Sequence, residues 1–84
     1  MDGYIDEWLV DLQGDGETAG QALEKLYQEM YRSVFLLAAS ITNDTAMAED
    51  AAHEVFLTLR RQAARYTPGS SGRAWIFSIT RNVS

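Results

Sequence analysis

The sequence has no cysteine, one proline and one histidine among its 84 residues. Without cysteine it forms neither a disulfide nor a thiolate metal site. No apolar run approaches the ~20 residues that a membrane-spanning helix needs. The acidic N-terminus MDGYIDEWLVDLQ also lacks the basic region and unbroken apolar stretch of a secretory signal. From the missing signal and membrane span we expect a cytoplasmic protein. From the single histidine and the lack of a serine-nucleophile motif we expect that the protein is not an enzyme, and we expect no cofactor.

The chain has a globular composition, with 46% apolar and 23% charged residues. Its length allows one small domain with a modest core. Charge is divided along it: residues 60–84 carry five of the seven basic residues and no acidic one, whereas all 12 acidic residues precede them. Such separation points to two kinds of contact. The basic end can meet phosphates, or its arginines can simply lie in solvent near helix ends.

Apolar residues recur at three- and four-residue steps in four segments, and no segment alternates with a period of two. We therefore expect an all-α domain, a compact bundle of three to four helices. The first helix is predicted over residues 2–13, with Asp2 as its cap and Gly14-Asp15-Gly16 ending it. The second is predicted over residues 18–42 and begins with a capping box of Thr18 and Gln21.

The apolar positions of the second helix form a stripe wide enough for a central core helix. They are Leu23, Leu26, Tyr27, Met30, Tyr31, Val34, Leu37, Ala38 and Ile41. The third helix is predicted over residues 45–66, and its alanine-rich face allows close approach to the second. That face consists of Ala48, Ala51, Ala52, Val55, Leu59 and Ala63.

Residues 67–72, with the only proline and two glycines, interrupt this periodicity. A last helix is predicted to start near Ser71 or Gly72. Its expected buried residues are Trp75, Ile76 and Ile79. This helix is still in progress at Ser84, which suggests a fragment of a longer protein.

The third helix also has an unusual outward side. Opposite its apolar face lie Asp50, His53, Glu54, Leu57, Arg60 and Arg61. A leucine flanked by charged and hydrogen-bonding groups favours a docking surface for another chain, although single exposed leucines are ordinary. Asp50, His53 and Glu54 also invite a metal-enzyme hypothesis. A second histidine or carboxylate cluster to complete such a site is missing, so we do not favour it.

The C-terminal segment RRQAARYTPGSSGRAWIFSITRNVS mixes arginines with Tyr66, Trp75 and Phe77. Arginines bind phosphate and aromatic rings stack on unpaired bases. Accessible backbone N–H groups at Gly69, Ser70 and Ser71 could add to a site for single-stranded nucleic acid. The alternative is that Trp75 and Tyr66 belong to the core.

The stretches AEDAAHEVFLTLRR and RAWIFSITRN, in this order, resemble the second conserved region of extracytoplasmic-function (ECF) sigma factors of bacterial RNA polymerase. The resemblance covers residues 23–82. It implies a helical domain that docks on the coiled-coil clamp of the largest polymerase subunit. It also implies that the domain reads the non-template strand of the promoter minus-ten element as it melts, and it makes a dedicated anti-sigma factor a possible further partner.

The resemblance divides the single domain into an acidic helix and turn (1–16), a core-binding hairpin (17–66), and a loop with the start of a promoter-reading helix (67–84). Together with the outward stripe, it implies a polymerase-binding set: Tyr31, Val34, Asp50, His53, Glu54, Phe56, Leu57 and Arg60. The implied DNA-binding set is Arg65, Thr67, Gly69, Ser70, Ser71, Arg73, Arg81 and Asn82.

Three positions depart from the family pattern. Arg60 replaces the usual tryptophan, and His53 stands where glutamine is usual. Gly72 stands where proline or phenylalanine is common, so we expect a more flexible loop. The domain that reads the upstream minus-thirty-five element is absent from this sequence. The alternative to a sigma domain is a helical protein-interaction module that does not read DNA.

Overall fold

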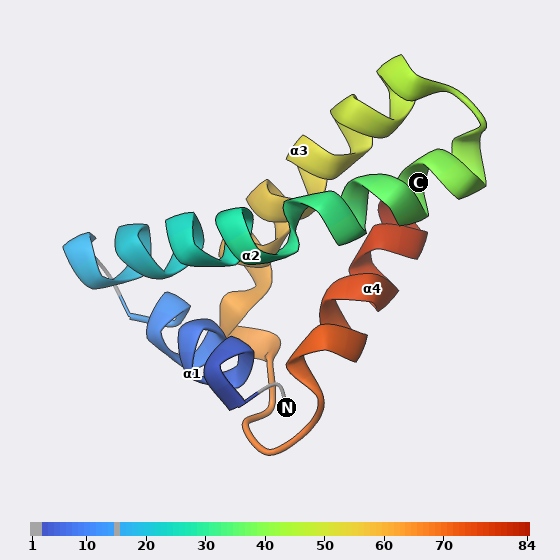
Figure 1. The fold of residues 1–84 in the computed structure, drawn as a ribbon. Coiled ribbons are helices and arrows are strands. Elements are labelled where there is room, and N and C mark those ends of the chain that lie inside the picture. Colours follow the sequence, from blue (N-terminus) through green and yellow to red (C-terminus); the bar gives the residue numbers. More distant parts are fainter. Residues whose placement is uncertain (1–2, 15) are drawn as a thin grey trace.

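The computed structural model describes residues 3–14 and 16–84, and the regular elements within these ranges are helices, without strands. The elements are α1 (Gly3–Leu12), α2 (Gly16–Thr42), α3 (Thr45–Gln62), the short 3-10 helix η1 (Ala63–Arg65) and α4 (Gly72–Val83). Figure 1 shows the long α2 crossing the molecule, with α1 near its N-terminal half and α4 near its C-terminal half. The predicted all-α fold is confirmed.

The core lies where the apolar faces of the four helices meet. Its fully buried side chains include Ile5, Leu9, Leu26, Met30, Val34, Val55, Leu59 and Ile76. A smaller cluster of Ala38, Ala48 and Ala51 joins the end of α2 to the start of α3. The small alanine side chains let these helices approach closely there, as the sequence predicted. Among the described helices, none is both long and apolar enough to cross a membrane.

The N-terminal boundary of α2 differs from the prediction. The helix begins at Gly16, two residues before Thr18, and the Gln21 side-chain amide donates to the Glu17 carboxylate at 3.3 Å. The predicted capping box is therefore wrong, because Thr18 lies inside the helix. The buried face starts with Ala19 and Ala22. At the first helix, the predicted cap Asp2 and the turn residue Asp15 lie outside the described residues.

Two predicted members of the α2 stripe lie at its margins. Tyr27 is 36% exposed and Ile41 is 42% exposed. The buried centre of the stripe consists of Leu26, Met30, Val34 and Ala38. The stripe drifts around a long helix because 3.6 residues make one turn, so positions at its edges leave the core.

The turn between α2 and α3 follows from its two central residues. Asn43 has a φ of 55°, a left-handed conformation that asparagine tolerates better than most residues. Asp44 then takes an extended conformation, and its carboxylate accepts a hydrogen bond from the Met47 N–H at 3.0 Å. This N-cap satisfies one of the free donors at the helix start, so α3 begins at Thr45 as predicted.

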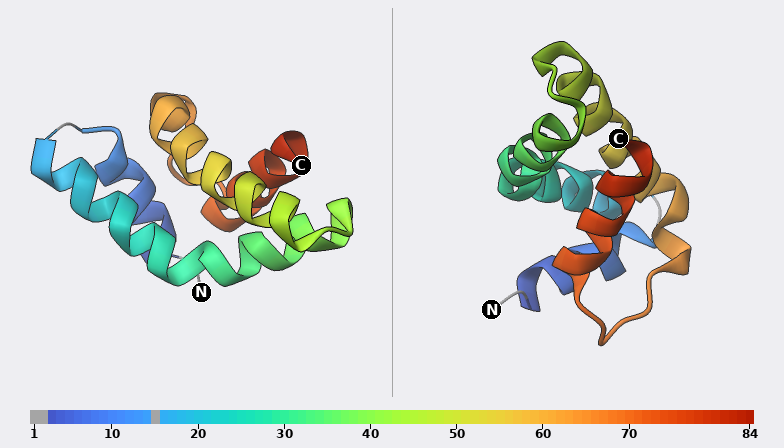
Figure 2. Two further views of the ribbon diagram at one scale, coloured as in Figure 1. Left: turned by 90° about the horizontal axis from the view of Figure 1, so that it is seen from above. Right: turned by 90° about the vertical axis from the view of Figure 1, so that its right-hand side faces the viewer.

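The α3 helix ends earlier than the predicted Tyr66. It stops at Gln62, and η1 tightens the chain before Tyr66 becomes extended. Ser71 caps α4 by accepting a hydrogen bond from the Ala74 N–H at 3.2 Å, so the predicted start of the last helix is confirmed. Figures 1 and 2 show the segment between η1 and α4 as an open loop beside the N-terminal end of α1.

Candidate functional site

The outward side of α3 forms an exposed ridge, which we call the α3 ridge: Asp50, His53, Glu54, Leu57, Arg60 and Arg61. Each of these side chains is exposed except Glu54, which is partly buried. The ridge points outward because Ala52, Val55 and Leu59 fill the opposite, buried face. Leu57 is 54% exposed in the middle of the ridge.

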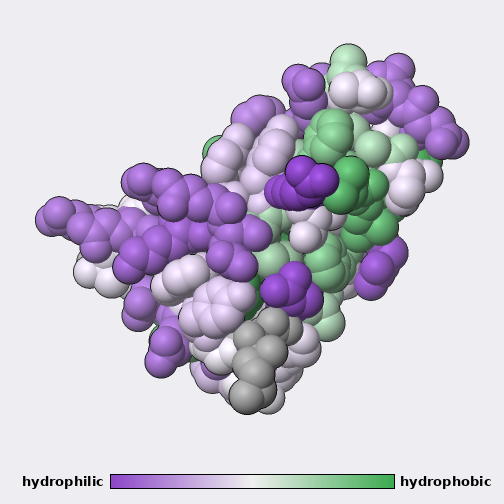
Figure 3. All heavy atoms as spheres, in the orientation of Figure 1, coloured by the Kyte–Doolittle hydropathy of each residue, from purple (hydrophilic) through white to green (hydrophobic). Residues whose placement is uncertain are grey.

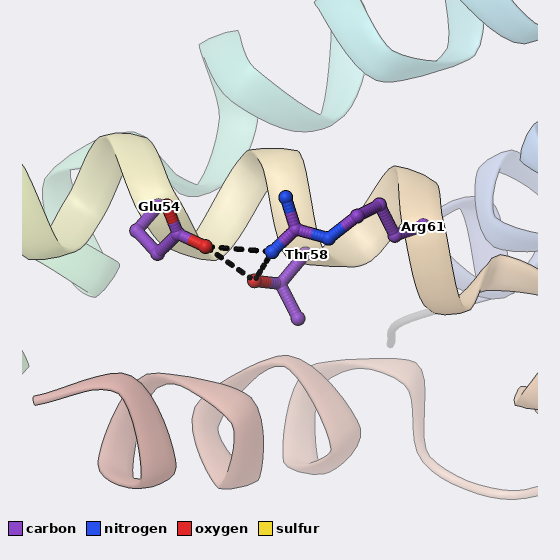
Figure 4. Close-up of polar contacts among 3 residues, drawn as sticks. All are labelled: Glu54, Thr58 and Arg61. Atoms are coloured by element: carbon purple, nitrogen blue, oxygen red, sulfur yellow. Dashed lines mark hydrogen bonds and ion pairs between the residues drawn. The ribbon is translucent and has the colours of Figure 1, made fainter.

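The part of the ridge from Glu54 to Arg61 is ordered by an ion pair between these two residues (Figure 4). The Arg61 guanidinium donates to the Glu54 carboxylate at 2.6 Å and to the Thr58 hydroxyl at 3.1 Å. The Thr58 hydroxyl in turn donates to Glu54 at 3.4 Å. The hydrogen bond from Arg61, together with its positive charge, lowers the pKa of Glu54 below its ordinary value. Glu54 is therefore a fixed, ionised carboxylate beside Leu57 at neutral pH.

On the side of His53, the ridge meets a row of aromatic rings on α2. Tyr27, Tyr31 and Phe35 lie one turn apart, with ring centroids 4.9 Å and 6.2 Å from each other. The His53 ring lies 6.0 Å from Tyr31 and 6.2 Å from Tyr27. Burial, followed by the neighbouring Tyr27 and Glu49, raises the pKa of Tyr31, so this phenol stays neutral. The ridge thus continues into a half-buried aromatic surface.

Two predicted polymerase-binding residues lie inside the molecule. Val34 is fully buried, and Phe56 is 4% exposed beneath Tyr27, whose ring centroid lies 5.0 Å away. The prediction that their side chains contact a partner is corrected, because both are covered by the domain itself. They support the surface from below. Tyr27 and Phe35 were not predicted as site residues, although the four-residue spacing of Tyr27, Tyr31 and Phe35 is a signal that could have found the row.

Leu57 is not the only exposed leucine in the described part of the chain. Leu36 on α2 is 53% exposed, two positions from the buried Val34 and therefore on the side of α2 away from the core. Figure 3 shows apolar side chains over the C-terminal half of α2 and hydrophilic ones over its N-terminal half. Exposure alone therefore does not single out Leu57. Its flanking carboxylates, imidazole and arginines do.

The loop between η1 and α4 exposes Thr67, Gly69, Ser70 and Ser71. It is partly ordered by itself, because both the N–H and the hydroxyl of Ser70 donate to the Thr67 carbonyl, at 3.3 Å and 2.7 Å. The Ser70 N–H is therefore engaged within the loop, contrary to the prediction that it is accessible to a ligand. Gly69 has a φ of 97°, which favours glycine at this bend. An open hollow of about 420 Å³ lies between the loop and α1, lined by Gly3, Asp6, Gly69, Ser70, Ser71 and Gly72.

The aromatic residues around the loop belong largely to the core. Tyr66 is 3% exposed, and its ring centroid lies 5.2 Å from that of the partly buried Trp75. Phe77 is also partly buried against the core. The hypothesis that Tyr66 offers its ring to an unpaired base is therefore wrong. The remaining predicted DNA-binding residues Arg65, Arg81 and Asn82 are exposed, and Arg73 is partly buried.

Gly72 has a different role from the one expected. It is buried at the start of α4, where an added Cβ would lie 2.9 Å from Leu9 Cδ1 and 3.1 Å from Ile5 Cγ2. Glycine at this position allows close packing of α4 on α1, instead of loosening the loop. Within residues 3–14 and 16–84, no group of three or more His, Cys, Asp or Glu residues could hold a metal ion.

Residues 26–84 match the family described as Sigma-70 region 2. The match spans more than half of the chain, from α2 to the end of α4, and the chain belongs to this family. Region 2 of sigma factors acts in transcription initiation, where it binds RNA polymerase and recognises the minus-ten element of promoters. Searches of the curated proteins and of the solved structures gave no significant match to this chain.

Proposed function

We propose that this chain is the region-two domain of an ECF sigma factor, which docks on polymerase through the α3 ridge and reads the minus-ten element with the loop and α4. The observation that carries the docking part is Leu57, 54% exposed between the carboxylates and arginines of one helix face. An apolar centre surrounded by a polar, partly hydrated rim is the usual arrangement of a protein interface, and Leu57 would supply that centre when buried by a partner.

The charges of the ridge suit a partner surface of mixed sign. Asp50 and Glu54 offer negative groups, while Arg60 and Arg61 extend the ridge with positive groups toward the end of α3. Because the Arg61 side chain holds Glu54 in place, part of the ridge is ordered before binding, which lowers the entropy cost of docking. The largest-subunit clamp coiled coil, a helical surface, is the proposed partner.

The proposed DNA-reading surface starts at the hollow beside Gly69, Ser70 and Ser71. A flipped base would enter this hollow, and the exposed Asn82 and Arg81 would meet the strand further along α4. Binding the unpaired strand more tightly than the duplex shifts the promoter toward its melted state, and it offsets the few kcal/mol, roughly, that extruding a base costs. The acidic first part of the chain repels phosphates, so the domain depends on polymerase for tight binding.

A pull-down of core polymerase tests docking. The variant Leu57→Asp with Glu54→Lys is expected to lose polymerase, because both changes alter the ridge without touching the core. Leu36→Asp is the matched control, since Leu36 is equally exposed, at 53% against 54%, but lies on another helix face. Retained binding by the ridge variant, or equal loss by Leu36→Asp, would contradict the docking surface.

The DNA part is tested by the binding of a minus-ten single strand to polymerase with and without the domain. Tighter binding in the presence of the domain is expected. If the domain docks but adds nothing to strand binding, the chain is an interaction module that does not read DNA.

A further inference from the structure

The helix α1 lies outside the family match, yet it contacts both ends of the segment that carries the loop. At the first end, the Gln13 side-chain amide donates to the carbonyl oxygens of Ala63 and Tyr66, both at 3.0 Å. These two carbonyls belong to the first residue of η1 and to the start of the loop. A single side chain next to α1 therefore satisfies two backbone acceptors where the chain leaves α3.

A second contact crosses directly from α1 to the loop. The Tyr66 hydroxyl lies within hydrogen-bond distance of two acceptors, the Asp6 carboxylate and, at 2.9 Å, the Ser70 carbonyl. The hydroxyl has one proton, which these two acceptors share. Because one acceptor belongs to α1 and the other to the loop, the hydroxyl joins the two segments. Tyr66 is 3% exposed and its ring packs on Trp75, so the packing holds the hydroxyl in this position.

The far end of the loop is held by packing. Gly72 lies against Leu9 and Ile5 of α1 so closely that a Cβ would come within 2.9 Å of a Leu9 methyl group. The loop thus leaves the bundle beside Gln13 and Asp6 and returns to it beside Leu9. Figures 1 and 2 agree that α1 and the loop lie side by side.

We infer that α1 sets the shape of the promoter-reading loop, with Asp6 and Gln13 as positioning residues that act through Tyr66 and the start of η1. The inference rests on the proposed function for its consequence in DNA binding. A loop that is already held in its binding shape loses less entropy when a strand arrives. If only a fraction of the free loops has this shape, the apparent affinity falls by that fraction.

Asp6 also lines the hollow beside the loop. Its negative charge could therefore affect DNA binding directly, and this effect must be distinguished from its role as the acceptor for the Tyr66 hydroxyl. Asp6→Asn keeps an oxygen that can accept from Tyr66 but removes the negative charge, which would repel a DNA phosphate. Asp6→Ala removes both. If Asp6 acts by position, Asp6→Asn keeps the loop ordered and Asp6→Ala does not.

Amide hydrogen exchange on the free domain tests the loop without DNA. The Ser70 N–H, which donates to the Thr67 carbonyl, is the reporter. We expect exchange at this amide about tenfold faster in Asp6→Ala and in Tyr66→Phe, because the loop opens locally, with unchanged protection in α2 and α3. Asp6→Asn stays close to the wild-type rate. Glu7→Ala, which changes the next residue of the same helix at an exposed position, is the control and leaves the rate unchanged.

The double variant Asp6→Ala, Tyr66→Phe should exchange no faster than either single variant, because the two residues belong to the same contact. Wild-type protection in both single variants, or strictly additive effects in the double variant, would overturn the inference.

Strand binding by the polymerase complex separates this inference from the proposed function. Asp6→Ala and Tyr66→Phe should bind the minus-ten strand about fivefold to tenfold more weakly, while polymerase docking is unchanged. If the wild type itself does not bind the strand, the proposed function fails, while the exchange result still decides whether α1 orders the loop. If the wild type binds and both variants bind equally well, the positioning role is wrong.

Discussion

Leu57 and Leu59 lie two positions apart on α3, yet Leu57 is 54% exposed and Leu59 is fully buried between α3 and its neighbours. The 100° rotation per residue places them on opposite sides of the helix. One leucine therefore serves the core and the other serves the α3 ridge, which makes them a matched pair for separating stability from binding.

Leu59→Ala is expected to reduce the free energy of unfolding by about 2–5 kcal/mol, since it removes buried methyl groups and leaves a cavity. Leu57→Ala is expected to change it by less than about 0.5 kcal/mol, because the side chain is largely in water. Urea denaturation followed by circular dichroism measures both. Equal destabilisation would mean that Leu57 is part of the core.

The Glu54–Arg61 pair predicts a pH dependence of stability. The pKa of Glu54 is lowered by Arg61 from its ordinary value of 4.5, so its contribution is complete above that value and is lost as the pH falls through the lower folded-state pKa. The side chains of Arg61 and Glu54 are 61% and 46% exposed, so solvent screens the pair and its contribution to stability is small. Thermal unfolding of wild type and Arg61→Ala should differ above this window and converge at acid pH. A difference that persists unchanged in acid would rule out this pair as its source.

Gly72 and Gly20 predict opposite effects of the same substitution. Gly72→Ala forces a Cβ against Leu9 and Ile5 and should destabilise the domain by about 1–3 kcal/mol. Gly20→Ala adds a Cβ inside α2 with nothing within 4 Å, and should stabilise it by about 0.5–1 kcal/mol through helix propensity. Chemical denaturation of both variants decides. A stabilised Gly72→Ala domain would show that α1 and α4 are not tightly packed.

Asn82→Ala is expected to weaken promoter opening while leaving polymerase docking intact, because Asn82 is an exposed residue of α4 and is not part of the α3 ridge. Opening is measured by permanganate reactivity of the minus-ten region, and docking by the same pull-down as for the ridge variants. Parallel loss of both activities would indicate a structural role for Asn82.

Helical periodicity predicted the elements and most of the faces correctly. Every apolar position predicted for α3, from Ala48 to Ala63, is buried, and the start of α4 follows from the cap at Ser71. The periodicity argument failed at margins. Family resemblance placed Val34 in the polymerase-binding set, although the apolar stripe of α2 already predicted that it is buried. Phe56 lies outside the predicted apolar face of α3, and its burial depends on which neighbouring helix covers it, which a pattern along one helix does not specify.

The order of hydrophobic and polar residues along the chain was enough to determine a helical domain, an outward ridge centred on Leu57 and a break before α4, because these depend on local geometry and on which side chains avoid water. Only the tertiary structure decided that Asp6 and Gln13 meet Tyr66, which lies 60 and 53 positions away from them in the sequence, and that Gly72 gives α1 room to pack. Such contacts depend on how separate helices pack against one another to fill a common core, and the sequence pattern of a single helix does not specify that packing.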